Sequence, residues 1–247
     1  MEGDPTVRLS QERPTADDTQ SPRPAGLSHQ QILVVFSGLI LGMVLGALDG
    51  TIVTTALPTI VGDLGGLEHL SWVGTIYLLT STVAVPLYGK LSDIHGRRHL
   101  IRAAIVIFLV GSVLTGLSQN IVQLIVFRSV QGIGGGGLMA MGMAVIGEIL
   151  SPRERGRYMG YLTPAFFLAS VGGPLFGGFF VDQLSWRWIF YINLPLGIAA
   201  LIVTNRALRV LPFTPRKARI DVLGATLLVA AASCLLLVST WGGRTYA

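Results

Sequence analysis

The sequence predicts an all-α integral membrane protein with about seven transmembrane helices. Hydrophobic residues make up 51% of the 247 residues and charged residues only 13%, which is about half the charged fraction of an ordinary soluble domain. Apolar runs of roughly 18 or more residues recur along the chain, and this is the helix length that crosses a bilayer core. A soluble domain would expose several of these runs to water, so the pattern argues against that class.

The apolar spans follow one another after a polar N-terminal segment. They cover residues 32–57, 71–88, 99–117, 121–149, 157–181, 188–211 and 220–241. Residues 1–28 are polar and contain four prolines, a composition that predicts a disordered tail. We therefore divide the chain into this tail, a six-helix unit over residues 29–211, and residues 212–247, which hold a loop and the seventh helix.

The distribution of charge predicts the orientation in the membrane. The net charge of +5 does not indicate a nucleic-acid partner, because the basic residues lie in short loops between apolar spans. Every second loop is basic, whereas the only lysine or arginine in the alternate loops is Arg187. The positive-inside rule then places the N-terminus and the basic loops in the cytoplasm. Four tryptophans fall at the opposite span ends, as an aromatic belt requires: Trp72, Trp186, Trp188 and Trp241.

Two charged residues lie deep inside apolar spans. Asp49 is in the first span and Arg128 is in the fourth, and counting along each helix places them at a similar depth. A buried carboxylate is costly unless it faces water or a partner, so a functional role is the default interpretation. The alternative is a structural, hydrogen-bonding aspartate beside Thr51. Because opposite buried charges cost less together than apart, we expect Asp49 and Arg128 to face the same polar cavity.

Glycine patterns indicate where helices approach one another closely. Gly38, Gly42, Gly46 and Gly50 form a stripe on the first span, which plain packing explains fully. Residues 131–137 (QGIGGGG) match a dinucleotide-binding fingerprint in letters, but no strand precedes them inside this apolar span. We interpret them as a close helix contact or a place where the helix bends. Residues 172–178 (GGPLFGG) predict a kink and a further close contact.

The loop over residues 89–98 (GKLSDIHGRR) combines two glycines, one acid and several cations. These features predict a compact, charge-paired latch at the membrane surface. His95 and His99 lack the cysteines or carboxylates of a metal site, and the single cysteine, Cys234, lies in an apolar run. We therefore predict no metal, no cofactor and no catalytic group, and hence a protein that is not an enzyme.

Taken together, these segments resemble the major facilitator superfamily, and in particular its 14-helix drug:proton antiporters. The segments that carry the resemblance are residues 48–58 (LDGTIVTTALP), 89–98, 128–134 (RSVQGIG), 173–178 (GPLFGG), 186–195 (WRWIFYINLP) and 221–224 (DVLG). They occur in the order of that family and on the corresponding helices. One local departure is Ile94, where many relatives carry a basic residue after the aspartate.

The resemblance implies a fold and a role for each motif. Residues 29–211 would form the N-terminal six-helix half of the transporter fold, followed by one linking helix. Asp49 would act in proton coupling or in recognition of cationic drugs, with Arg128 aiding proton transfer. The remaining motif residues would act in gating and in helix contact. The gating residues are Gly89, Asp93, Gly96, Arg97 and Arg98, and the antiporter-motif residues are Gly173, Pro174, Gly177 and Gly178.

The implied function is proton-coupled efflux of small amphipathic or cationic compounds across the plasma (inner) membrane. The partners would be the small-molecule substrate, protons and the lipid bilayer. Such transporters have two halves with the substrate site between them, and this chain supplies one half. Two alternatives therefore remain: a truncated fragment that does not transport, or a half-transporter that works as a homodimer.

Overall fold

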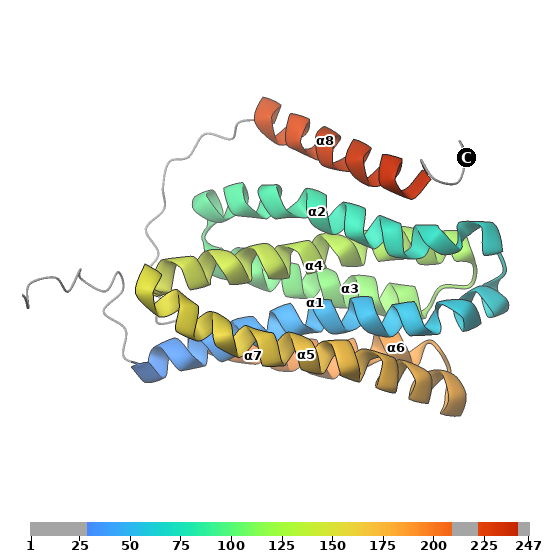
Figure 1. The fold of residues 1–247 in the computed structure, drawn as a ribbon, viewed down its shortest axis with the longest axis horizontal. Helices are drawn as coiled ribbons and strands as arrows, with labels where there is room; N and C mark the ends of the chain where they lie inside the picture. The colour runs from blue at the N-terminus through green and yellow to red at the C-terminus, as the bar shows by residue number, and fades with distance from the viewer. Residues whose placement is uncertain (1–28, 209–221, 242–247) are drawn as a thin grey trace, which may run out of the picture.

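The computed structural model describes residues 29–208 and 222–241, and every long element in this part of the chain is a helix. Figure 1 shows the helices lying side by side as an elongated bundle. The elements are α1 (His29–Leu64), the short 3-10 helix η1 (Leu67–His69), α2 (Leu70–His95), α3 (Arg97–Gly116), α4 (Ile121–Ile149), α5 (Pro152–Gln183), α6 (Trp188–Tyr191), α7 (Asn193–Ala207) and α8 (Val222–Trp241). The expected disordered tail, most of the loop before the seventh helix, and the last six residues lie outside the described residues.

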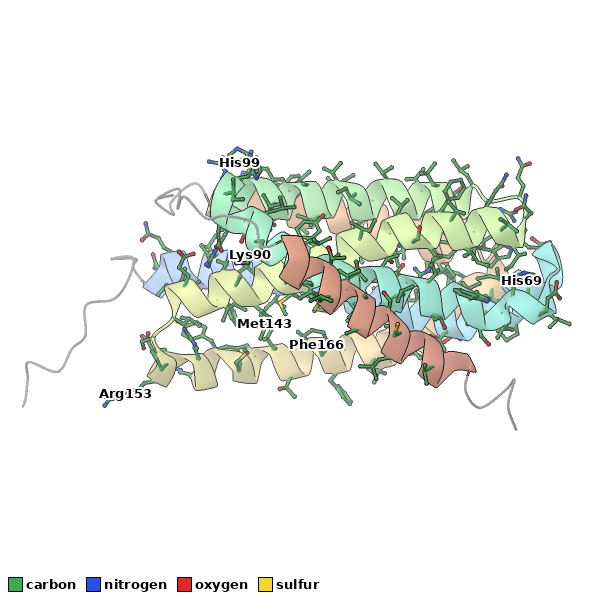
Figure 2. The ribbon with its side chains drawn as sticks, turned by 90° about the horizontal axis from the view of Figure 1, so that it is seen from above. His69, Lys90, His99, Met143, Arg153 and Phe166 are labelled. Carbon is green, nitrogen blue, oxygen red and sulfur yellow. The ribbon has the colours of Figure 1, made fainter. Side chains whose placement is uncertain are left out.

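The predicted all-α membrane fold is confirmed. Six helical stretches of the described residues are long and apolar enough to cross a membrane, and α6 and α7 together make the sixth. The predicted seventh span corresponds to α8, a further apolar helix of 20 residues. It packs against α2 and runs obliquely across the bundle in the view of Figure 2.

Two helices, α1 and α2, extend by seven residues beyond their predicted C-terminal ends. We expected the first span to stop at Leu57, before Pro58, but α1 continues to Leu64. Within a membrane bundle a helix tolerates proline because neighbouring groups satisfy the freed backbone. We also expected a loop from Gly89, but α2 runs to His95. The connection to α3 is reduced to Gly96, whose φ of 86° is a left-handed value that favours glycine.

The sixth span is interrupted, which the sequence analysis did not predict. Its helix stops at Tyr191, Ile192 forms a turn, and α7 starts at Asn193. Pro195 lies just after the break and has no N–H to bond to the carbonyl of Tyr191, four residues earlier. The break places Asn193 at the first position of α7, deep inside the bundle.

Helix α4 lies against α1, α2 and α3, and its glycines explain the close packing. A Cβ added to Gly136 would overlap the backbone of Ser81 on α2, and one added to Gly134 would overlap the backbone of Phe108 on α3. The run over residues 131–137 is therefore a helix-packing surface, and α4 passes through it without interruption. Of the two interpretations of this run, close contact is the one that the structure supports.

The charged residues separate toward the two ends of the bundle. Arginines lie at the starts of α3 and α5 and Lys90 lies near the end of α2. Figure 2 shows Lys90, His99 and Arg153 toward one end and His69 at the other. We call the first of these the basic end. At the opposite end, Asp63 on α1 accepts hydrogen bonds from Trp186 Nε1 (2.8 Å) and Arg187 Nη1 (3.3 Å). Trp186 was expected in an aromatic belt, but it is buried against Phe190.

Candidate functional site

The two intramembrane charges of the sequence analysis meet in the middle of the bundle. Arg128 Nη1 donates to Asp49 Oδ2 at 2.5 Å, and the two residues are 1% and 0% exposed. The expected proximity of Asp49 and Arg128 is confirmed. They form a buried ion pair inside the helix packing instead of facing an open cavity.

Three neutral polar side chains complete the cluster around the carboxylate. Gln131 Nε2 donates to Asp49 Oδ1 (2.8 Å) and Asn193 Nδ2 donates to the same oxygen (2.9 Å). Both amides also donate to Ser112 Oγ, at 3.2 Å and 2.9 Å. Ser112 in turn donates to the Phe190 carbonyl at 2.8 Å. We call Asp49, Ser112, Arg128, Gln131 and Asn193 the polar cluster.

Aromatic rings cover the cation of the polar cluster. The Arg128 guanidinium lies 4.2 Å from the centroid of the Tyr77 ring and 6.0 Å from that of Phe190. Such contacts attract a desolvated cation through the ring quadrupole. Tyr77 also donates its hydroxyl to the Gly46 carbonyl at 3.4 Å, which holds the ring in place. The ion pair is thus isolated from water on the side of α2.

Buried apolar residues lie on both sides of the polar cluster along the length of the bundle. One buried apolar group contains Leu45 and Leu138 and extends toward the basic end, and a second contains Ile52 and Leu124 and extends toward the other end. On α1 the boundary between them falls at Asp49. The fold therefore concentrates its buried charge in one layer across the helices.

The hydrogen bonds of the polar cluster match an ionised carboxylate at Asp49. Every described side chain that contacts Asp49 does so through a donor: Arg128, Gln131 and Asn193. Gln131 Oε1 also accepts from Arg128 Nη1 at 2.9 Å. Thr51 is not a partner of Asp49, because its hydroxyl lies within donating distance of the carbonyl oxygens of Ala47, Leu48 and Ala169. The hydrogen bonds of Asp49 to other helices also fit the structural interpretation of this aspartate.

The α5 motif packs against α1 directly after Asp49. A Cβ on Gly173 would overlap Thr51 Oγ1, and one on Gly177 would lie 3.0 Å from the Ile52 carbonyl oxygen. Gly178 differs, because nothing lies within 4 Å of an added Cβ. Pro174 lies inside the continuous helix α5. Gly173 and Gly177 thus lie in a close helix contact, whereas Gly178 leaves space for a side chain.

The segment over residues 89–98 is charge-paired, but with a partner outside the segment. Arg97 Nη1 lies 2.5 Å from Glu148 Oε2 on α4 and donates to the Ala144 carbonyl at 2.6 Å. Arg98 and Arg102 both donate to Asn205 Oδ1 on α7. We expected Asp93 to be the acid of this latch, but among the described residues its carboxylate forms no ion pair. Glu148 takes that place because α4 ends beside the α2–α3 turn.

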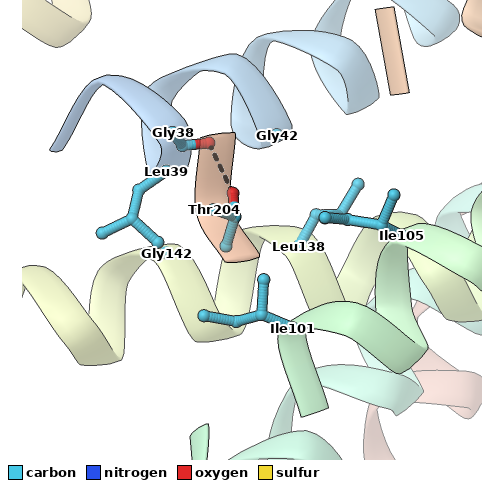
Figure 3. Close-up of a pocket in the computed structure, with 8 residues that line it drawn as sticks. All are labelled: Gly38, Leu39, Gly42, Ile101, Ile105, Leu138, Gly142 and Thr204. Carbon is cyan, nitrogen blue, oxygen red and sulfur yellow. Dashed lines mark hydrogen bonds between the residues drawn. The ribbon is translucent and has the colours of Figure 1, made fainter. Parts of the chain in front are cut away.

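A small cavity lies between α1, α3, α4 and α7, toward the basic end (Figure 3). Its volume of about 10 Å³ is the size of one water molecule, far below the roughly 300 Å³ of a small-molecule site. Thr204 donates to the Gly38 carbonyl across it at 3.3 Å. The lining residues are Gly38, Leu39, Gly42, Ile101, Ile105, Leu138, Gly142 and Thr204.

The sequence analysis missed Tyr77, Ser112 and Asn193 as members of the site, and it included Gln131 in the segment 128–134 without assigning it a role beside Asp49. One signal was available: Gln131 lies three residues after Arg128, so both face the same side of a helix. Ser112 and Asn193 are polar residues in apolar spans, but nothing in their local sequence points to Asp49. Among the described residues no group of three or more histidine, cysteine or acidic residues is placed to hold a metal ion.

Comparison with known proteins supports the family that the motifs suggest. Residues 39–242 match the Major Facilitator Superfamily. The multidrug transporter protein MdtP of Bacillus subtilis is 46% identical over 87% of this chain and 39% of its own length. Multidrug resistance protein 3 of the same organism is 41% identical over 86% of this chain and 41% of its own. The chain therefore spans about two-fifths of the length of these relatives.

A solved structure agrees at the level of the fold. The human organic anion transporter MFSD10 superposes with a TM-score of 0.67, over 82% of this chain and 54% of its own, at 19% identity. That identity supports the fold alone. Because the family match covers residues 39–242 of 247, the chain belongs to the major facilitator superfamily.

Proposed function

We propose that this chain acts in proton-coupled export of small amphipathic or cationic compounds, as one half of a two-half transporter. The observation that carries the proposal is the fully buried Asp49–Arg128 ion pair. Intramembrane ionisable pairs mark proton and substrate pathways in transporters. The names of the relatives, a multidrug transporter and a multidrug resistance protein, support export of drug-like compounds.

Proton coupling follows from the cost of neutralising one member of a buried pair. Protonation of Asp49 removes the charge that compensates Arg128, and an uncompensated buried charge is strongly unfavourable. The bundle must then rearrange so that Arg128 reaches water or another partner. Conversely, loss of that proton restores the counter-charge of Arg128. Binding and loss of one proton at Asp49 would therefore bias the transporter between two states.

The rest of the transporter would complete the substrate site. In this superfamily the site lies between two halves, and helix α5 leaves large apolar residues uncovered: Phe167, Leu168 and Leu175 are 66%, 69% and 67% exposed. Such residues suit lipid or a partner helix. The second half would be a C-terminal half of the same family or a second copy of this chain. We place the assembly in the plasma membrane, and the positive-inside rule favours an N-terminus in the cytoplasm.

The test is drug accumulation in energised cells that express the 247-residue chain, with and without a proton uncoupler. A matched pair of variants on α1 isolates the role of the buried carboxylate: Asp49→Asn against Asp63→Asn, whose side chain is 53% exposed. In the form that exports, the chain alone or the chain with a separate C-terminal half, we expect uncoupler-sensitive export that Asp49→Asn abolishes and Asp63→Asn preserves. Export that survives Asp49→Asn would reject the coupling role.

A second expression experiment separates the two sources of the missing half. The chain is expressed alone and together with the part of the Bacillus subtilis relative that the match does not cover. Export by the chain alone supports self-association, and export only on co-expression supports a separate C-terminal half. If neither combination exports although the chain is inserted in the membrane, it is a non-transporting fragment and the proposal is wrong.

A further inference from the structure

We propose that the side-chain amide of Asn193 is a proton-controlled switch that donates to ionised Asp49 and turns over to accept from protonated Asp49. The inference rests on the proposed function, in which Asp49 takes up and releases a proton. It adds a positioning residue that acts through Asp49 and transmits the protonation state of the carboxylate to the junction between α6 and α7.

The position of the Asn193 amide supplies the first observation. Asn193 is fully buried, and its Nδ2 lies 2.9 Å from both Asp49 Oδ1 and Ser112 Oγ. Its own oxygen, Oδ1, has no hydrogen-bond partner, and among the described residues it is the only buried side-chain oxygen in that condition. An unsatisfied buried acceptor destabilises the folded state, so its presence calls for a reason.

Protonation of Asp49 provides that reason. The carboxylate now receives only donors, from Arg128, Gln131 and Asn193, and a carboxyl O–H placed among donors has no acceptor. If the amide turns by half a turn about its Cβ–Cγ bond, Oδ1 takes the place of Nδ2. The new carboxyl group then donates its hydrogen to Asn193 Oδ1, and the proton stays on Asp49.

The side-chain amide of Gln131 is less able to rotate in the same way. Its amide is satisfied at both ends, because Nε2 donates to Asp49 and Ser112 while Oε1 accepts from Arg128. Reversal would lose the bond from Arg128 and point an N–H group at the guanidinium. Reversal of Asn193 exchanges two donated bonds for two accepted ones, from the Asp49 carboxyl and from the Ser112 hydroxyl.

Rotation of the Asn193 amide has a consequence for the backbone of the sixth span. Ser112 now donates to the Phe190 carbonyl on α6, but a reversed Asn193 amide would attract that hydroxyl hydrogen to its own oxygen. The Phe190 carbonyl would then lose its bond to α3. Asn193 itself is the first residue of α7, directly after the break at Ile192. Protonation of Asp49 is thereby transmitted to the point where the sixth span is interrupted.

No other titratable group competes for this role within the described packing. Arg128 on α4 is the charged group that contacts Asp49, and Tyr77 on α2 faces it across the guanidinium. Helices α3, α6 and α7 present the neutral groups Ser112, Phe190 and Asn193. Helix α5 approaches α1 beside Asp49 through Gly173. The proton that controls the orientation of the Asn193 amide is therefore the one on Asp49.

Infrared difference spectroscopy of the purified full chain at high and low pH tests the switch without a transport assay. The C=O stretching band of a protonated carboxyl group that is absent from Asp49→Asn belongs to Asp49. We expect Asn193→Leu, which removes the acceptor at nearly constant volume, to shift this band to higher frequency. Asn205→Leu, on the same helix but bonded to Arg98 and Arg102, should leave it in place.

A second measurement needs no substitution at Asn193 and covers the case in which Asn193→Leu does not fold. With isotope-labelled asparagine, the wild-type chain should show an asparagine amide C=O band that shifts together with the Asp49 band, and Asp49→Asn should lack that shift. The switch is wrong if Asn193→Leu leaves the frequency of the Asp49 band unchanged, or if the asparagine amide band does not shift with pH. Either result leaves the proposed function standing. Absence of any Asp49 band overturns both.

Discussion

Arg128 Nη1 lies 2.5 Å from Asp49 Oδ2, although 79 residues separate the two in the chain. Both side chains are withdrawn from solvent, so the charge of each is compensated by the other and by the amides of the polar cluster. Removal of one partner leaves the other buried without its counter-charge, which costs about 3–5 kcal/mol. The consequences of this pair can be measured without a transport assay.

We expect Arg128→Leu to lower the free energy of unfolding by about 3–5 kcal/mol. The double variant Asp49→Leu/Arg128→Leu should recover most of that loss, because it removes both charges. The measurement is unfolding of the purified chain in detergent, followed by tryptophan fluorescence. Independent, additive effects of the two substitutions would show that the pair is not energetically coupled.

The glycines of α4 provide a second prediction, on packing. Gly136→Ala places a Cβ where the Ser81 carbonyl oxygen lies, and because backbone atoms cannot move aside cheaply, we expect a destabilisation of about 1–3 kcal/mol. Gly147→Ala on the same helix meets only the Arg155 side chain, at 3.8 Å. That control should be neutral or slightly stabilising, since alanine favours a helix over glycine. Thermal unfolding in detergent compares them, and equal midpoints would contradict the packing account.

The α5 motif gives a third prediction, which separates two glycines that the sequence treats alike. Gly173→Ala overlaps Thr51 Oγ1, whereas Gly178→Ala meets nothing within 4 Å. We expect Gly173→Ala to reduce both stability and export, and Gly178→Ala to change stability by less than about 0.5 kcal/mol. Thr51→Ala should partly rescue Gly173→Ala by removing the nearest atom. Absence of rescue would indicate that the contact with the Ile52 backbone dominates.

A fourth prediction concerns the end of the bundle opposite the basic end. Trp186→Phe keeps an aromatic ring against Phe190 but loses the bond from Nε1 to Asp63 Oδ2, which should lower the free energy of unfolding. Trp188→Phe is the matched control, because Trp188 is 49% exposed and donates to no described carboxylate. If both variants unfold at the same denaturant concentration, the bond to Asp63 contributes nothing to stability.

A fifth prediction concerns the ion pair at the basic end. Glu148→Gln removes the charge that faces Arg97, but the two side chains are 55% and 28% exposed, so the loss should stay below about 1 kcal/mol. Arg97 also keeps its bond to the Ala144 carbonyl. Denaturant unfolding at low and high salt measures the effect, which salt should diminish. A loss of several kcal/mol would mean that the pair is less solvated than its exposure indicates.

Much of the architecture was predictable because a bilayer imposes simple rules. Apolar runs of fixed length gave the helices, and the lone charges Asp49 and Arg128 stood out against them. The exact ends were less predictable: Pro58 and Pro195 look alike in sequence, yet α1 continues through the first while the sixth span breaks just before the second. What decides between them is the packing around each proline, which local sequence does not describe.

The chain by itself determined that this protein is a bundle of membrane-crossing helices with one acid and one arginine in its interior, because hydropathy and charge act residue by residue. Only the tertiary structure decided which groups surround them. Ser112 and Asn193 join Asp49 because α3 and the broken sixth span bring them to its level. Likewise Glu148, and not Asp93, faces Arg97. Such choices depend on distances between helices, and these are set by close packing at glycines far away in the sequence.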